Sequence, residues 1–335
     1  MLKTKTLIVV GAGASKEFGL PIGVELPKSI AQVLSFDIDA FGEVEGGDAD
    51  IRNIARRQLG YTAREVYAAS KLIRDGLPLS FSIDNFLDKH HANPPVQALG
   101  RLALVHCLLK AESRSALFVG RTQPLINFAG LQDNWLNRLF TALQDRVRLE
   151  HIDRIFDELT IITFNYDRCI EHYLHHALQA NYGVGEAEAA EVVKRLRLVH
   201  VYGALAPLPW QGGRRAISFG QEHVPLVDLW QNIRTYADEI EDTTTVQSMR
   251  EWATEVETVF YLGFSYLPQN MTFVTPYIRD GIHHAYGSAF GMSSFDTSEI
   301  SKALQKTVVS SMTQDVNLVG VTAAELLKSY SRALF

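Results

Sequence analysis

The sequence predicts an α/β protein: a Rossmann-like parallel sheet with helices on both faces, plus an inserted all-helical module. Two observations predict this fold. Short, continuously apolar runs alternate with segments of helical periodicity, which is typical of a parallel sheet covered on both faces. The first run, Thr6–Val10, leads directly into the small residues GAGAS at Gly11–Ser15, as a strand-to-helix turn does.

The helical module is predicted over residues 27–157. Within it, the segment Thr62-Ala-Arg-Glu65 is a capping box, and the apolar spacing that follows ends at Gly76. Two further apolar stripes predict helices over residues 96–112 and 136–147.

The sheet is predicted to continue after this module. Its remaining strands are expected at four apolar runs, residues 159–164, 196–201, 258–264 and 316–321. Helices are expected near residues 168–178 and over residues 323–333. The predicted domains are therefore a sheet domain, made of residues 1–26 and 158–335, and the inserted module.

Composition narrows the function classes. The chain has 335 residues, 47% hydrophobic and 21% charged, and can bury a large core. A net charge of -6 provides no basic field for nucleic acid. Two distant cysteines, Cys107 and Cys169, indicate neither a disulfide framework nor a Cys-based zinc site. No apolar run approaches the roughly 18 residues of a membrane span, so we expect a cytoplasmic protein without membrane contact.

Small or polar residues follow four of the predicted strands. Ligands of such sheets bind beyond the carboxyl ends of the strands, so these residues are the candidate site. They are Gly11, Ala12, Gly13, Ala14 and Ser15 after the first strand, Asn165 and Asp167 after the second, His200, Tyr202 and Gly203 at the third, and Gly263 and Ser265 at the fourth. Glycines 11 and 13 allow close approach of a phosphate, but Lys16 replaces the third glycine of the dinucleotide motif. The alternative is a turn that binds nothing.

Four segments, in the same order, resemble motifs of the sirtuin family. They are GAGASKEFGLPIG (residues 11–23), similar to the nucleotide loop; TFNYDRCIE (163–171), similar to the Thr-x-Asn-Tyr-Asp segment of bacterial sirtuin-like proteins; VHVYGAL (199–205), similar to the strand with the catalytic His-Gly pair; and FYLGFS (260–265), similar to the later Gly-x-Ser strand. The match spans most of the chain but leaves out the helical module.

The resemblance implies that NAD+ binds at the sheet edge, with its diphosphate near Gly11–Ser15 and its nicotinamide near Asn165 and His200. Breaking the bond between ribose and nicotinamide forms an oxocarbenium-like centre and frees a neutral leaving group, so the site must place a nucleophile and stabilise positive charge. An Asn can orient a water or a ribose hydroxyl, and a His can take a proton. Asp167 would hold a ribose hydroxyl or the local backbone, and Ser265 would contact the cofactor.

Two departures from the family pattern bear on the reaction. In deacylating sirtuins the catalytic His immediately precedes the glycine, but here Tyr202 precedes Gly203. His200 lies two residues before Tyr202, on the same strand face and about 6 to 7 Å away along the strand. The alternative for His200 is a buried strand histidine that makes an ordinary hydrogen bond. The four thiolates of the sirtuin zinc module are absent, so no zinc is expected. That module shapes the acyl-lysine groove, and its loss favours water as the acceptor.

The favoured function is therefore an NAD+ glycohydrolase that releases nicotinamide and ADP-ribose. Resemblance to the zinc-free bacterial branch implies an antiphage defence effector that depletes NAD+ when activated. Control is then expected from assembly into a homo-oligomer or from a partner such as a HerA-type hexameric ATPase. Two alternatives stay open: an NAD-dependent protein deacylase or ADP-ribosyltransferase, and a non-catalytic NAD or ADP-ribose sensor.

Three other patterns have weaker interpretations. His172, His175 and His176 share a helix face at a spacing that suits a metal, although a solvated or interface face is favoured. The segment Gly263–Leu267 lacks the final glycine of a nucleophile elbow, which argues against a serine hydrolase. The small residues of 285–291 line the adenosine end of the site or form a close-packed turn.

Overall fold

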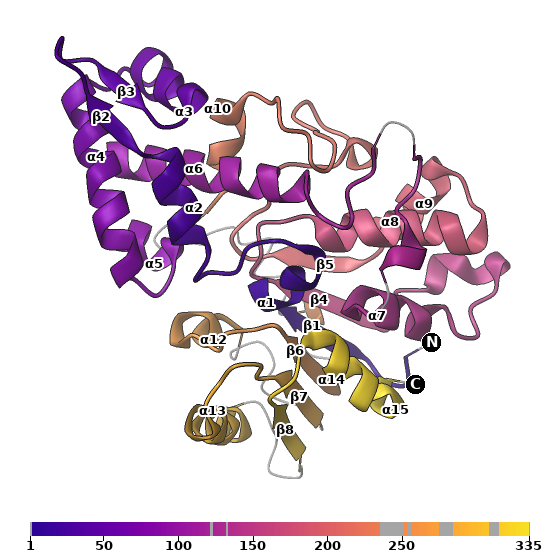
Figure 1. Ribbon diagram of the computed structural model, residues 1–335. Helices are drawn as coiled ribbons and strands as arrows, with labels where there is room; N and C mark the ends of the chain where they lie inside the picture. Colours follow the sequence, from indigo (N-terminus) through magenta and orange to yellow (C-terminus); the bar gives the residue numbers. More distant parts are fainter. Residues whose placement is uncertain are drawn as a thin grey trace. The chain divides into compact units, whose positions relative to one another are not determined.

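A computed structural model describes residues 2–120, 123–131, 133–234, 251–252, 256–274, 284–307 and 315–334 (Figure 1). The chain divides into two compact units. The first, called the sheet unit, comprises residues 1–18, 116–201 and 240–335. The second unit comprises residues 19–115 and 202–239.

Six parallel strands form the centre of the sheet unit. They are β1 (Thr6–Val10), β4 (Leu159–Thr163), β5 (Arg197–His200), β6 (Thr258–Leu262), β7 (His284–Ser288) and β8 (Asp315–Val319), in the spatial order β5-β4-β1-β6-β7-β8. Numbered along the chain, this order is 3-2-1-4-5-6, that of doubly wound dinucleotide-binding folds. The predicted Rossmann-like fold is confirmed. The chain leaves β1 for β4 on one side and later returns to β6 on the other, so the order reverses at β1.

The register of the three central strands brings their ends to one level. Val10 pairs with Thr163 on one side and with Leu262 on the other. Every residue of β1, β4 and β6 is buried, as expected for strands covered on both faces. The segments that follow these three strands therefore leave the sheet side by side.

Helices cover both faces of this sheet. They are α1 (Ala12–Ser15), α7 (Trp135–Gln144), α8 (Cys169–Tyr182), α9 (Glu186–Val193), α12 (Pro268–Val274), α13 (Ser294–Thr307), α14 (Ala323–Ser329) and α15 (Ser331–Leu334), with 3-10 turns at Lys16–Phe18, Phe128–Gly130 and Leu149–Arg154. Helix α7 packs against α8 and α14, which makes them one layer. Helices α12 and α13 lie on the side of the sheet away from α14 (Figure 1).

The second unit is built around the buried helix α6. Its elements are α2 (Leu26–Val33), β2 (Phe36–Ile38), β3 (Val44–Gly46), α3 (Ala49–Asn53), a π-helical turn (Ile54–Gln58), α4 (Ala63–Gly76), α5 (Ile83–Lys89), α6 (Pro94–Glu112) and α10 (Leu226–Leu229), with 3-10 turns at Leu77–Leu79, Pro209–Gln211 and Trp230–Asn232. The predicted capping box is present: Thr62 N donates to Glu65 Oε2 (2.7 Å), and Thr62 Oγ1 accepts from Glu65 N (3.3 Å). Helix α6 packs against α2, α4 and α10.

The structure corrects the predicted module in two ways. The second unit is not all-helical, because β2 and β3 form an antiparallel pair. Its boundaries also differ from 27–157. Residues 116–157 belong to the sheet unit, where α7 is part of a helix layer. Residues 202–239 join the second unit, where Gly220 N donates to the buried Glu112 Oε2 (3.0 Å). The boundary shifts arise from contacts between segments that are distant in sequence, whereas β2 and β3 pair locally.

Strand β7 was not predicted. Its sequence, HAYGS, has few of the branched apolar residues that mark the other strands. Gly287 is closely packed, because a Cβ at this position would lie 2.1 Å from the Tyr266 hydroxyl and that side chain would have to shift. Residues 284–288 are thus a strand, and within the segment 285–291 a turn is present only at Phe290 and Gly291. Over the residues described, none of the helices combines the length and apolarity that a membrane crossing needs.

Candidate functional site

The turn after β1 and the end of β6 are in direct backbone contact. Gly11 N donates to Leu262 O (3.0 Å), and Gly13 N donates to Gly263 O (2.9 Å). A Cβ at Gly11 would lie 2.6 Å from Gly263 O, and one at Gly263 would lie 1.9 Å from Ala14 N. Close packing of two backbones therefore requires these glycines. It also pairs the N–H groups of Gly11 and Gly13 with protein carbonyls.

Asn165 joins the end of β4 to this turn. Its Nδ2 donates to Gly11 O (3.1 Å) and to Ser15 Oγ (2.9 Å), and its backbone N donates to Thr163 Oγ1 (3.1 Å). Gly11 O can only accept, so the side-chain atom facing it must be the amide nitrogen. The amide orientation is thereby defined. Both of these side-chain hydrogen bonds of Asn165 are thus made by Nδ2 and not by Oδ1.

His200, at the end of β5, lies between two acceptors. Its Nδ1 is 2.9 Å from the Asn165 carbonyl oxygen, and its Nε2 is 2.8 Å from Glu171 Oε1. The side chains of His200 and Glu171 are both nearly buried, with exposed fractions of 12% and 7%. The structure thus brings together Asn165 and His200, the two predicted catalytic residues, and adds a carboxylate that was not predicted.

The pKa shifts of this pair have opposite signs. Burial acts to lower the pKa of His200, but the charge and hydrogen bond of Glu171 outweigh it, so the pKa of His200 is raised. Burial acts to raise the pKa of Glu171, but the charge and hydrogen bond of His200 outweigh it, so the pKa of Glu171 is lowered. Both directions favour an imidazolium–carboxylate ion pair.

The other predicted residues occupy varied positions. Asp167 Oδ1 accepts from Cys169 N (3.1 Å) at the start of α8, so its contact is with the local backbone, one of the two predicted roles. Ser265 is exposed and follows β6. Tyr202 and Gly203 belong to the second unit, where Arg234 N donates to Tyr202 O (2.9 Å).

A solvated or interface face was favoured for the three histidines of α8, but two of them are not solvated. His172 and His175 are buried, and each places Nε2 3.0 Å from a backbone carbonyl, that of Leu117 and of Glu186 respectively. Burial lowers the pKa of all three histidines, to about 4 for His176. Throughout the described part of the chain, no three His, Cys, Asp or Glu side chains form a metal-binding group.

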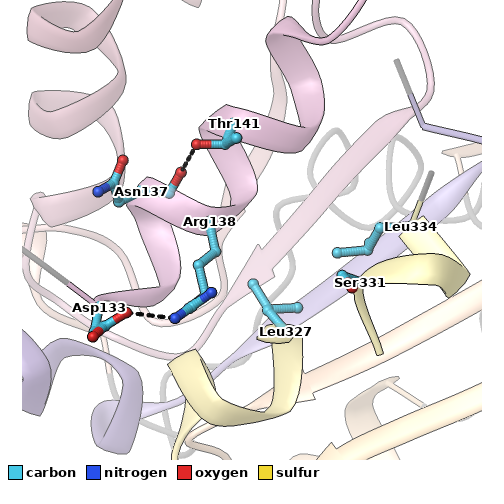
Figure 2. Close-up of a pocket in the computed structure, with 7 residues that line it drawn as sticks. All are labelled: Asp133, Asn137, Arg138, Thr141, Leu327, Ser331 and Leu334. Carbon is cyan, nitrogen blue, oxygen red and sulfur yellow. Dashed lines mark hydrogen bonds and ion pairs between the residues drawn. The ribbon is translucent and has the colours of Figure 1, made fainter. Parts of the chain in front are cut away.

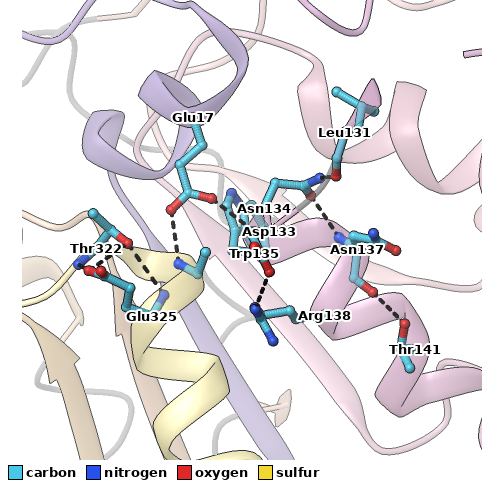
Figure 3. A network of polar contacts seen from close by, with 11 residues as sticks. Glu17, Leu131, Asp133, Asn134, Trp135, Asn137, Arg138, Thr141, Thr322 and Glu325 are labelled. Carbon is cyan, nitrogen blue, oxygen red and sulfur yellow. Dashed lines mark hydrogen bonds and ion pairs between the residues drawn. The ribbon is translucent and has the colours of Figure 1, made fainter. Parts of the chain in front are cut away.

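Glu17 is a second carboxylate that sequence reasoning missed. Its Oε2 accepts from Trp135 N (2.8 Å) at the start of α7, and its Oε1 accepts from Ala324 N (2.9 Å) in the first turn of α14 (Figure 3). Trp135 also donates its indole N–H to Ala14 O (3.1 Å). Glu17 therefore ties the segment after β1 to two helices of one layer. Burial raises the pKa of its carboxyl, and the two backbone donors offset this only in part.

Glu17→Ala is expected to lower the free energy of unfolding by about 2 kcal/mol, because two first-turn N–H groups lose a charged acceptor. Urea unfolding followed by circular dichroism measures this loss. Glu150→Ala, which removes an exposed carboxylate, is the control and should change stability by less than about 0.5 kcal/mol. Equal losses in both variants would contradict the linking role of Glu17.

A separate pocket lies between α7 and the C-terminal helices. It has a volume of about 220 Å³ and is lined by Asp133, Asn137, Arg138, Thr141, Leu327, Ser331 and Leu334 (Figure 2). Arg138 pairs with Asp133 in its wall. None of the predicted site residues lines this pocket, so it does not belong to the Asn165–His200 cluster.

The strand order, the helices on both faces and the polar cluster at the carboxyl ends of the central strands define an α/β protein of the Rossmann-like class. No model of a known protein family matches the chain, and no curated protein matches it. The sirtuin resemblance therefore depends on the four motifs alone.

Proposed function

We propose that the protein is an NAD+ glycohydrolase that releases nicotinamide and ADP-ribose at the carboxyl ends of β1, β4 and β6. The observation that supports this most is the anchored amide of Asn165. Gly11 and Ser15 hold Nδ2, which leaves Oδ1 as a fixed acceptor next to the reversal of strand order. A fixed acceptor can orient a water or a ribose hydroxyl, which is what hydrolysis through an oxocarbenium-like centre needs.

The surroundings of His200 support hydrolysis over transfer to an acyl-lysine. Transfer requires a base that removes a proton from an acceptor or a ribose hydroxyl. Both ring nitrogens of His200 already face protein acceptors at 2.8 and 2.9 Å. A reaction with a neutral leaving group and water as acceptor depends less on such a base.

The test is incubation of the purified chain with NAD+, alone and with candidate partner proteins, while free nicotinamide and ADP-ribose are measured. We expect turnover without an added acceptor and a loss of at least about 10²-fold in Asn165→Ala, because the nucleophile is no longer oriented. Asn137→Ala, at the separate pocket, is the matched control and should retain the full rate.

Two results would count against this proposal. Turnover only when an acyl-lysine peptide is supplied would favour a deacylase. Binding of NAD+ without any turnover, measured by calorimetry, would favour a sensor.

The cellular role is a further part of the proposal. A glycohydrolase of this kind would act in the cytoplasm as an antiphage effector, held inactive until a homo-oligomer or an ATPase partner assembles it. The sirtuin resemblance supports this role. Measuring cellular NAD+ after phage infection, in cells that express the wild-type chain or Asn165→Ala, tests it.

A further inference from the structure

We propose that Glu171 is a positioning residue that holds His200 as an imidazolium, and that His200 orients Asn165 instead of acting as the general base. The catalytic part of this inference rests on the proposed function. The protonation state of His200 does not, and it can be measured without any substrate.

With Glu171 ionised, the state that its lowered pKa favours, both contacts of the His200 ring require a donor. The Asn165 carbonyl oxygen can only accept a hydrogen bond, and an ionised carboxylate also only accepts. A neutral imidazole has a single N–H, so one ring nitrogen would point its lone pair at an oxygen less than 3 Å away. The imidazolium satisfies both contacts. It has no lone pair left with which to take a proton.

The charges around the pair agree with this state. Asp167 adds to the negative field that raises the pKa of His200, whereas the charge of the buried Arg168 helps to lower the pKa of Glu171. The second carboxylate oxygen, Glu171 Oε2, is buried and has no hydrogen-bond partner among the described residues. Glu171 thus directs its one hydrogen-bonded oxygen at His200.

The imidazolium completes the set of bonds that fixes Asn165. The backbone N–H of Asn165 donates to Thr163 Oγ1, and the backbone carbonyl of Asn165 accepts from His200 Nδ1. The side-chain amide of Asn165 donates to the backbone of the turn after β1. A charged donor makes a stronger hydrogen bond than a neutral one. Removing the charge at Glu171 therefore loosens Asn165 without deleting any side chain that would touch NAD+.

The first measurement is ¹⁵N NMR of the full chain with labelled histidine, with the His200 signals assigned by their loss in His200→Asn. At pH 7 we expect both ring nitrogens to be protonated and the titration midpoint to lie above the ordinary value of 6.5. In Glu171→Gln the midpoint should fall below that value. A neutral His200 ring in the wild-type chain at pH 7 would overturn the proposal.

The second measurement is the pH profile of NAD+ turnover. If His200 acts as an imidazolium, kcat falls as pH rises through its pKa, and the fall moves to lower pH in Glu171→Gln. At pH 7 we expect that variant to lose about 10²-fold in kcat with little change in KM, and Glu171→Asp to restore part of the rate. Glu188→Gln, an exposed change on α9, should leave the rate unchanged.

A rate that rises with pH through the His200 pKa would identify His200 as the general base and would contradict its role as an imidazolium. Circular dichroism of each variant shows whether a lost rate reflects lost folding. If the wild-type chain turns over no NAD+ either alone or with the candidate partner proteins, the proposed hydrolase fails. The NMR result then decides the state of His200 by itself.

Discussion

Gly263→Ala is expected to lower the free energy of unfolding by about 4 kcal/mol, because its new methyl group has no space. An added Cβ would lie 1.9 Å from Ala14 N and 2.3 Å from the Gly13 carbonyl carbon, and both are backbone atoms that no rotamer change can move. The backbone of Gly263 is also left-handed, with φ at +56°, which side chains with a Cβ rarely adopt. The variant must separate the end of β6 from the turn after β1.

Gly291→Ala is the matched control for this prediction. Gly291 has φ at +77°, but nothing lies within 4 Å of an added Cβ. It should lose only about 1 kcal/mol, from the backbone conformation alone. Urea unfolding at a fixed pH compares the two variants. Similar losses at both positions would mean that the contact between the two backbones adds nothing to stability.

The second large effect is expected when one member of the Glu171–His200 pair is removed. At pH 7, His200→Leu leaves a buried carboxylate without its main counter-charge, and about 3 kcal/mol of stability should be lost. Replacing both residues by Leu removes the charge as well, so the double variant should be more stable than His200→Leu. A double-mutant cycle by urea unfolding measures this coupling. Additive single losses would show that the two side chains do not interact.

The same pair predicts a pH window for stability. The pKa of His200 is raised on folding, so its contribution is complete below the ordinary value of 6.5 and is lost as pH rises through the folded-state pKa. The pKa of Glu171 is lowered, so its contribution is complete above the ordinary value of 4.5 and is lost as pH falls through the folded-state pKa. Between pH 4.5 and 6.5, the stability difference between the wild-type chain and Glu171→Gln/His200→Gln should be largest. A difference that does not vary with pH would contradict the ion pair.

Much of the sheet could be predicted because its strands are marked locally. β1, β4 and β6 are buried on both faces, so each must be apolar at every position, and such runs are visible without any partner. The start of α4 is equally local, because both halves of its capping box lie within four residues. Strand β7 has no such apolar run and was therefore not predicted.

The candidate site could be predicted only in part. The rule that ligands lie beyond the carboxyl ends of parallel strands selected Asn165 and His200, and the structure brings them together. Glu171 lies in the same segment as Asn165, residues 163–171, but nothing in the sequence shows that its carboxylate contacts His200 on strand β5. Glu17 was missed for the same reason, since its partners lie 118 and 307 residues away.

The sequence by itself determined the fold class, five of the six strands of the sheet and the polar residues at the strand ends, because apolar periodicity and capping are properties of neighbouring residues. Only the tertiary structure decided which carboxylate faces His200, why the glycines after β1 and β6 must be glycines, and which segments form the second unit. Each of these depends on atoms brought together by the register of parallel strands or by helix packing, and local sequence carries little information about such contacts.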